Sequence, residues 1–217
     1  MPPNKGADLS MVRSCRRVAT QPPETSPQRT VETTKLASMD RARAGELVNL
    51  LKAWHPNHYD GRTSPLTSAS RWLGQAKEGF VKDRGLHISV VFLSSSPAAL
   101  VFWTPCGRTS SRSGGGRSML LVRRTLGKPR TRPGNGRLSL LAFLADAHAK
   151  GFGTATVEGS QCTHELWGFY EHVGFRGHCK GPQSSMILEL SAGAVRGLKR
   201  VHDAREPGHA EKRRLSL

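Results

Sequence analysis

Glu165–Gly177, with the sequence ELWGFYEHVGFRG, is the stretch that decides the fold. Its aromatic residues recur at helical spacing, and Thr163 just before it is a candidate N-cap. Gly174 is typical of the glycine that ends a helix in the left-handed conformation, and Phe175 can fold back onto that end. The residues expected to pack into a core are Trp167, Phe169, Tyr170 and Val173. The stretch therefore predicts a capped helix buried on one side.

The residues before this helix predict a β-α-β unit. A β-branched and leucine-rich run, Met119–Leu126, favours a strand, and the turn RPGNG follows at Arg132–Gly136. RLSLLAFLADAHAK, at Arg137–Lys150, predicts a strongly amphipathic helix that ends at Gly151. A further strand is expected from about Thr154 to Glu158.

The glycine turn in this unit predicts an anion site. Glycines before a helix let backbone N–H groups converge, and the helix N-terminus adds unsatisfied donors and a partial positive charge. Arg130, Arg132 and Arg137 carry the same preference. No G-K-[ST] follows, which excludes a Walker-type phosphate loop, and a third glycine for a dinucleotide fingerprint is missing. A steric reason alone can also place glycines before a helix.

The remaining segments complete a mixed α/β pattern. The expected elements, in chain order, are a strand at Thr30–Ser38, helices at Met39–His55 and Ser68–Asp83, hairpin strands HISVVFLS and AALVFWTP, and a closing strand at Ser184–Leu190. We expect a single α/β domain over residues 30–191. Residues 1–29 and 192–217 are expected to be disordered, basic N- and C-terminal arms.

Charge is the strongest feature of the composition. The 217 residues carry a formal net charge of +17, and no Asp or Glu occurs from Arg84 to Ala145. Such a field attracts polyanions, although drift towards arginine in the coding sequence gives the same composition. No apolar run is long enough to span a membrane. The four cysteines show no paired spacing and no signal-peptide core is present, so we expect a cytoplasmic protein, with the nucleus or nucleoid as alternatives.

The span from Gly134 to Arg176 resembles the cofactor-binding half of the GNAT acyltransferases. That family shows a [QR]-x-x-G-x-[GA] loop, a leucine-rich helix, a glycine, a strand and a helix ending in F-Y-x-x-x-G-F. The sequence GNGRLSLLAFLADAHAKGFGTATVEGSQCTHELWGFYEHVGFR follows this layout. The loop position of the family's Gln or Arg is Thr131 here, and Pro133 removes one backbone donor. The resemblance implies a GNAT-like domain with a mixed, mostly antiparallel twisted sheet flanked by helices.

The resemblance also implies acetyl-CoA as the acyl donor and an amine as the acceptor, on a small molecule or a protein. The pyrophosphate would lie on the N–H groups of the glycine turn, and the pantetheine arm along the end of the preceding strand. The implied cofactor-binding residues are Leu126, Arg132, Gly134, Asn135, Gly136, Arg137 and Thr163. No metal is expected, because Cys162, His164, His172, His178 and Cys179 match no familiar zinc spacing.

Tyr170 is similar in position to the family's general acid, with plain packing as the alternative. The general base stays open among Glu158, Glu165 and His164, because the preceding strand offers no carboxylate. Acceptor contacts are expected from the AWHPNHY segment, with loop packing as the alternative; these are Trp54, His55, His58 and Tyr59. A second function stays open: a non-catalytic protein of the same fold that binds DNA or RNA, or a ribonucleoprotein, through its basic surface.

Overall fold

A computed structural model describes residues 29–56, 66–108, 118–129, 135–158, 164–177 and 185–193. The side chains of His164 and Glu165 are not described. The strands are β1 (Arg29–Lys35), β2 (His87–Leu93), β3 (Ser96–Arg108), β4 (Ser118–Gly127), β5 (Phe152–Glu158), β6 (Arg176–Gly177) and β7 (Ser185–Glu189). The helices are α1 (Arg41–Trp54), α2 (Thr67–Glu78), α3 (Asn135–Ala149) and α4 (His164–Val173), with a 3-10 turn, η1, at Leu36–Ser38.

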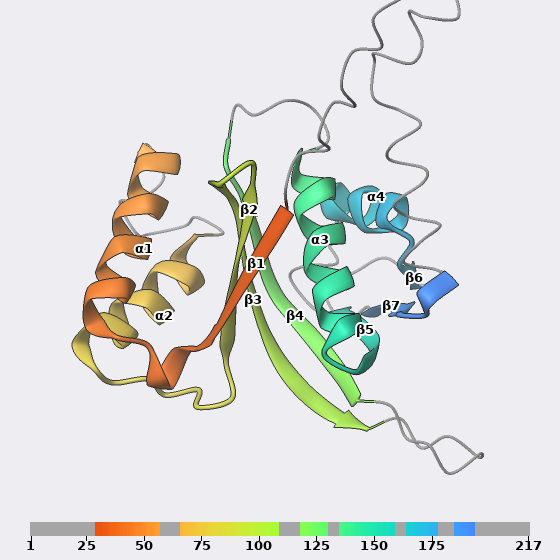
Figure 1. Ribbon diagram of the computed structural model, residues 1–217, viewed down its shortest axis with the longest axis horizontal. Coiled ribbons are helices and arrows are strands. Elements are labelled where there is room, and N and C mark those ends of the chain that lie inside the picture. The colour runs from red at the N-terminus through yellow and green to blue at the C-terminus, as the bar shows by residue number, and fades with distance from the viewer. Residues whose placement is uncertain are drawn as a thin grey trace, which may run out of the picture.

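The strands form one seven-stranded sheet in the order β1-β2-β3-β4-β5-β7-β6. Every neighbouring pair is antiparallel except β4 and β5, which run parallel. Helix α3 makes the crossover between these two parallel strands, as parallel pairing requires. Figure 1 shows α1 and α2 on one side of the sheet and α3 and α4 on the other. The expected single α/β domain with a mostly antiparallel sheet and flanking helices is confirmed.

The sheet divides the core into two clusters, because side chains of a strand alternate between its faces. On β3, Leu100 and Phe102 pack under α1 and α2, whereas Val101 and Trp103 pack under α3. The cluster under α1 and α2 is called the α1/α2 cluster below. The opposite one, which includes Phe143 of α3, is called the α3/α4 cluster.

Local chemistry explains most element boundaries. The Asp40 carboxylate caps α1 by accepting the N–H groups of Ala42 and Arg43 at 3.1 and 3.3 Å. Helix α2 ends at Gly79, whose φ of 79° is left-handed. The predicted helix over Ser68–Asp83 was therefore too long by its last turn, because Gly79 stops it.

Four further details differ from the sequence-based expectations. Strand β1 ends at Lys35 and a 3-10 turn occupies Leu36–Ser38, where a strand was expected. The two-residue β6 was not expected. The strongly amphipathic character expected of α3 is wrong, because none of its residues from Asn135 to His148 is exposed. The helix packs against strands β1 to β5 of the sheet and also against α4.

The terminal arms, 1–28 and 194–217, lie outside the described residues. Their expected disorder and the domain boundaries at residues 30 and 191 thus stay predictions. Among the described helices, none combines the length and apolar character needed to cross a membrane.

Candidate functional site

Strands β4 and β5 part in the middle of the sheet. Their parallel pairing runs from Ser118 with Phe152 to Val122 with Val157 and ends there. Strand β4 continues to Gly127, still paired with β3 on its other side. Within the described ranges no strand pairs with this last part of β4 on the β5 side. An unpaired strand edge presents backbone N–H and C=O groups to a ligand, and we call Arg123–Gly127 the open edge.

The start of α3 lies against the end of the open edge. A Cβ atom added to Gly127 would lie 4.0 Å from the Cα of Gly136. A Cβ atom added to Gly136 would lie 3.8 Å from Cε2 of Phe169 on α4. The two glycines therefore allow strand, helix start and α4 to converge without side chains between them. The first N–H groups of a helix have no partner inside that helix, so they can bind an anion at this point.

Four side chains on the open edge and the first turns of α3 have buried polar atoms without a hydrogen-bond partner. They are Arg124 Nε, Thr125 Oγ1, Arg137 Nε and Ser139 Oγ. Each is expensive to leave without a partner in a folded protein, so such a group is commonly a place where a ligand or water binds. The residues present thus fit a polar, partly anionic ligand that lies along the open edge and ends at α3.

Tyr170 lies in the α3/α4 cluster with only 1% of its surface exposed. Its ring makes edge contacts with Phe169 and Phe175, with ring centroids 5.2 and 5.4 Å away. Gly174 has a φ of 105°, and the Phe175 N–H donates to the Tyr170 carbonyl at 3.0 Å, so the predicted helix end is confirmed. The packing of Trp167 and Val173 is confirmed as well, and Phe169 is partly buried.

The Tyr170 phenol also interacts electrostatically with Arg124 of the open edge. Burial lowers the pKa of the Arg124 guanidinium from its ordinary value, and the phenol of Tyr170 acts in the opposite direction and raises it. The two groups therefore lie close enough to interact electrostatically. This electrostatic interaction links α4, the helix of the opening motif, with the strand beside the parting.

Glu158 is the last residue of β5, directly after the final β4–β5 pair, and its side chain is exposed. Burial has the largest effect on the Cys106 thiol and raises its pKa. The Thr156 hydroxyl lowers this pKa, and the Glu158 carboxylate raises it. Glu158 and Cys106 thus lie within electrostatic reach of each other. Among the base candidates, the structure describes the side chain of Glu158 alone.

The other predicted site residues divide into two groups. Arg132, Gly134 and Thr163 lie outside the described residues, as do His58 and Tyr59. Leu126 lies on the open edge, with its side chain 8% exposed in the α1/α2 cluster. Trp54 belongs to the same cluster and is 7% exposed, which agrees with the packing alternative. His55 ends α1 by donating its N–H to the Leu51 carbonyl at 3.1 Å.

Sequence reasoning missed Arg124, Thr125 and Ser139. Arg124 was visible only as one cation in a long basic stretch. Its place beside Tyr170 depends on a register shift: Phe102 pairs with Arg124 whereas Trp103 pairs with Val122, so Arg123 is an extra residue. No local sequence signal marks this bulge.

In the part of the chain that the structure describes, no group of at least three His, Cys, Asp or Glu side chains could hold a metal ion. Cys162, His178 and Cys179 of the sequence cluster lie outside that part. No metal role is derived for the remaining members.

With this geometry in view, the chain was compared with known proteins. No protein-family model matches the sequence, and no curated protein matches it. Solved structures of N-acetyltransferases are similar in structure. One is the PaiA N-acetyltransferase from Thermoplasma acidophilum in complex with coenzyme A, at a TM-score of 0.47 and 15% identity, covering 74% of this chain and 99% of that chain.

Two more are of the same kind. A protein described as an acetyltransferase of the GNAT family from Desulfovibrio desulfuricans has a TM-score of 0.48 and 15% identity, with 76% of this chain and 100% of that chain covered. The GNAT-family N-acetyltransferase YhbS from Escherichia coli, in complex with CoA, has a TM-score of 0.46 and 14% identity, with 82% and 88% covered. Similarities at these scores do not assign an activity.

Proposed function

We propose that the protein is an acetyl-CoA-dependent N-acyltransferase of the GNAT type, which moves an acetyl group to an amine. The single observation that carries the proposal is the parting of β4 and β5 beside a glycine-built helix start. It is supported by the buried polar atoms without partners that border this parting. The resemblance of Gly134–Arg176 to that family's cofactor-binding half points to the same chemistry.

Each part of the donor has residues of suitable chemistry. The N–H groups of Asn135 and Gly136 and the guanidinium of Arg137 would hold the pyrophosphate, because a helix start and a cation both favour an anion. The backbone of the open edge as far as Leu126 would bond the amide groups of the pantetheine arm, as a peptide adds to a strand edge. By the resemblance, Arg132, Gly134 and Thr163 belong to the same site.

When bound, acetyl-CoA supplies an acyl carbon activated as a thioester. Transfer to an amine forms a carbon–nitrogen bond, breaks the carbon–sulfur bond and moves one proton from nitrogen to sulfur. Tyr170, close to Arg124, is proposed to donate the proton to sulfur. Glu158, which directly follows the last β4–β5 pair, is proposed to accept the proton from nitrogen, with His164 and Glu165 as the alternatives.

Ligand-induced stabilisation tests the proposal directly. Acetyl-CoA at about 100 times its Kd should stabilise the protein by about 2.7 kcal/mol, measured as a shift in thermal unfolding. Release of free thiol should then depend on an added amine, measured across an amine panel. If acetyl-CoA neither stabilises the protein nor is consumed, the proposal is wrong.

A matched pair of glycine variants locates the effect. Gly136→Asp adds a negative charge in the first turn of α3, where the helix dipole favours it, so the free protein should keep its stability. The same carboxylate repels the pyrophosphate and should lower acetyl-CoA affinity by about tenfold or more, which equals about 1.4 kcal/mol. Gly45→Asp adds the same charge to α1, where a Cβ meets nothing within 4 Å, and should leave affinity unchanged. Equal affinities in the two variants would place the cofactor elsewhere.

The alternative function, binding of DNA or RNA, depends mainly on the basic residues of the terminal arms and of the segments 109–117 and 130–134. These segments lie outside the described residues. None of the described features favours nucleic acid over acetyl-CoA, so the alternative stays a prediction from charge alone.

A further inference from the structure

The face of the sheet that α1 and α2 cover carries a cation at the open edge. Cross-strand partners in an antiparallel pair point to the same face, and Arg124 is the partner of Phe102. Because Phe102 belongs to the α1/α2 cluster, the side chain of Arg124 starts on that face, while its guanidinium lies within electrostatic reach of Tyr170 in the α3/α4 cluster. Its Nε atom is buried and has no hydrogen-bond partner. A buried N–H group without an acceptor is costly unless a ligand supplies one.

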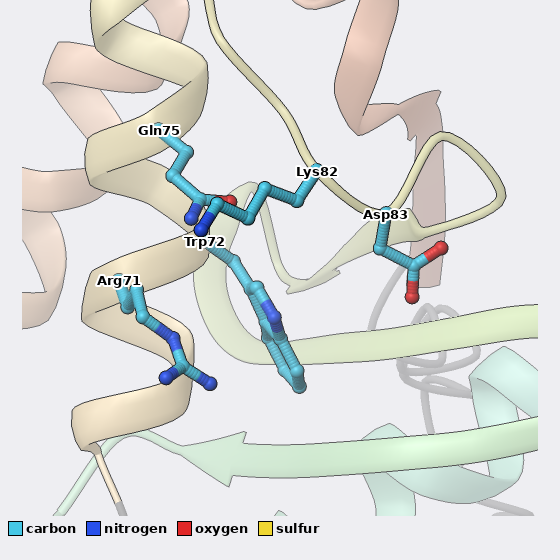
Figure 2. A pocket seen from close by; sticks show the side chains of 5 residues that line it. All are labelled: Arg71, Trp72, Gln75, Lys82 and Asp83. Carbon is cyan, nitrogen blue, oxygen red and sulfur yellow. The ribbon is translucent and has the colours of Figure 1, made fainter.

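A cavity of about 240 Å³ opens on the same face. Its lining residues are Arg71, Trp72, Gln75, Lys82 and Asp83. Figure 2 shows Arg71, Trp72 and Gln75 on α2, with Trp72 pointing towards the strands, and Lys82 and Asp83 on the segment that follows the helix. The Trp72 ring lies 5.3 Å from the Phe102 ring, measured between centroids. Phe102 thus contacts Trp72, which lines the cavity, and is the cross-strand partner of Arg124.

The charges of this region are unbalanced. The ion pairs of the described residues join Arg43 with Glu32 and Glu46, and Lys150 with Asp146. None of them includes Arg71, Lys82 or Arg124. The one carboxylate of the cavity, Asp83, already accepts the Gly85 N–H at 3.1 Å. A region with three such cations repels a polycationic acceptor and attracts one that bears a negative charge.

We propose that the acceptor is an amine that also carries an anionic group, a carboxylate or a phosphate, and that Arg124 binds this group. The inference rests on the proposed acyltransferase function and assigns the substrate class of that site. Arg71 and Lys82 attract the same charge from the cavity, and the Trp72 ring offers an apolar surface to the rest of the acceptor. The anionic group takes no part in bond making, so the transfer stays balanced as described above.

Pairs of amines that differ only in the anionic group test the proposal. One arm compares an amino acid with its amide, and a second arm compares phosphoethanolamine with ethanolamine, so that carboxylate and phosphate are told apart. Spermidine serves as the polycationic acceptor. We expect turnover of at least one anionic amine to exceed that of spermidine, measured as kcat/KM by thiol release.

Variants of the cationic side chains then distinguish a loss of acceptor recognition from a general loss of activity. Arg124→Gln should lower kcat/KM for the preferred anionic amine by about 10- to 100-fold, mainly through KM, because a hydrogen bond to a charged group is lost. Because Arg124 also interacts with the proposed general acid Tyr170, the same variant should lower kcat/KM for the uncharged partner of that pair as well, but by a clearly smaller factor, and Arg124→Lys should recover part of the loss for the anionic amine. The double variant Arg71→Gln, Lys82→Gln should show a smaller loss of the same kind. Lys77→Gln, on α2 outside the cavity, is the matched charge control and should change kcat/KM neither for the anionic amine nor for its uncharged partner.

The outcomes distinguish this inference from the function on which it rests. If acetyl-CoA is consumed but spermidine is the best acceptor, or if Arg124→Gln lowers turnover of charged and uncharged amines equally, the substrate class is wrong and the acyltransferase stands. If acetyl-CoA does not stabilise the wild-type protein, both proposals fail. Thermal unfolding of each variant with acetyl-CoA shows whether the donor site is intact.

Discussion

The two faces of the sheet have similar apolar cores, but they differ at the border with the open edge. The α1/α2 cluster and the α3/α4 cluster each hold a fully buried phenylalanine, Phe102 at 0% and Phe143 at 1% exposure. Where the α3/α4 cluster meets the open edge, however, the chain leaves Thr125, Arg137 and Ser139 with buried polar atoms that lack partners. Apolar burial accounts for both clusters, whereas the polar border does not stabilise the fold. The difference separates side chains that stabilise the fold from side chains whose polar atoms are available to a ligand.

The largest effect tests the similarity of the two clusters. Phe102→Ala and Phe143→Ala should each lower the free energy of unfolding by about 3–5 kcal/mol, because each leaves a cavity in a closed core. Urea denaturation measures both. A cost below about 1 kcal/mol for either variant would mean that its cluster is loosely packed and that the comparison fails.

Tyr170→Phe tests whether the packed phenol at the border also does chemistry. As the proposed general acid, its loss should lower kcat by about 10²- to 10⁴-fold. The ring stays in place, so the free energy of unfolding should fall by no more than the roughly 0.5–1.5 kcal/mol of a hydrogen bond. Steady-state kinetics and urea denaturation give the two values.

The contrast with a purely structural neighbour completes this test. Phe175→Leu removes the ring that contacts Tyr170 but no proton donor, and should cost stability with a much smaller loss of kcat. Full turnover by Tyr170→Phe would leave the residue as packing alone.

The sequence predicted what local chemistry determines. Gly151 and Gly174 both take positive φ angles, 91° and 105°, at the ends of α3 and α4, where a glycine is the residue best suited to that backbone. The hairpin between β2 and β3 was also expected, although its turn places two serines, Ser94 and Ser95, at positive φ. These features depend on residues near one another in the chain.

Features that depend on pairing between distant strands were not predictable. The end of the β4–β5 pairing after Val122 and Val157 and the bulge at Arg123 follow from the register of the assembled sheet. That bulge decides the face on which Arg124 emerges, since one extra residue reverses the alternation of side chains. Thus the helix ends could be predicted from the positions of Gly151 and Gly174, but the face on which Arg124 starts could not.

Two buried serines allow a direct comparison of the apolar core with the polar atoms that lack partners at the open edge. Both Ser89 and Ser139 are 0% exposed. The Ser89 hydroxyl accepts the Trp103 indole N–H at 2.9 Å and lies 2.8 Å from the Thr33 hydroxyl. Ser89→Ala should therefore lower the free energy of unfolding by about 1–3 kcal/mol, because the buried indole loses its acceptor. Ser139→Ala loses no hydrogen bond and should change it by less than about 0.5 kcal/mol, or raise it.

Urea denaturation of the two serine variants without ligand gives this difference. A cost for Ser139→Ala as large as that of Ser89→Ala would show that its hydroxyl has a partner in the free protein. The polar border would then contribute to stability like the rest of the core.

The smallest effect concerns His87, on the side of the sheet under α3. Its ring stacks on Trp103 with centroids 4.6 Å apart, and its Nδ1 lies 2.9 Å from the Gly85 carbonyl oxygen. Burial lowers the pKa of His87 from its ordinary 6.5, and the charges of Lys35 and Lys150 lower it further, while the Gly85 carbonyl acts in the opposite direction. The unfolded chain therefore takes up this proton at a higher pH than the folded protein.

The sign of the pH dependence follows from that order. Above the unfolded pKa of 6.5 neither state is protonated and His87 has no effect, whereas below it the free energy of unfolding falls until the folded pKa is passed. His87→Phe keeps an aromatic ring against Trp103 and cannot titrate, so its stability should fall less over the same range. Urea denaturation of both proteins about one pH unit above and about one below 6.5 measures the difference. Equal losses in the two proteins would show that the imidazole is protonated as readily in the folded state as in the unfolded chain, which its burial against Trp103 opposes.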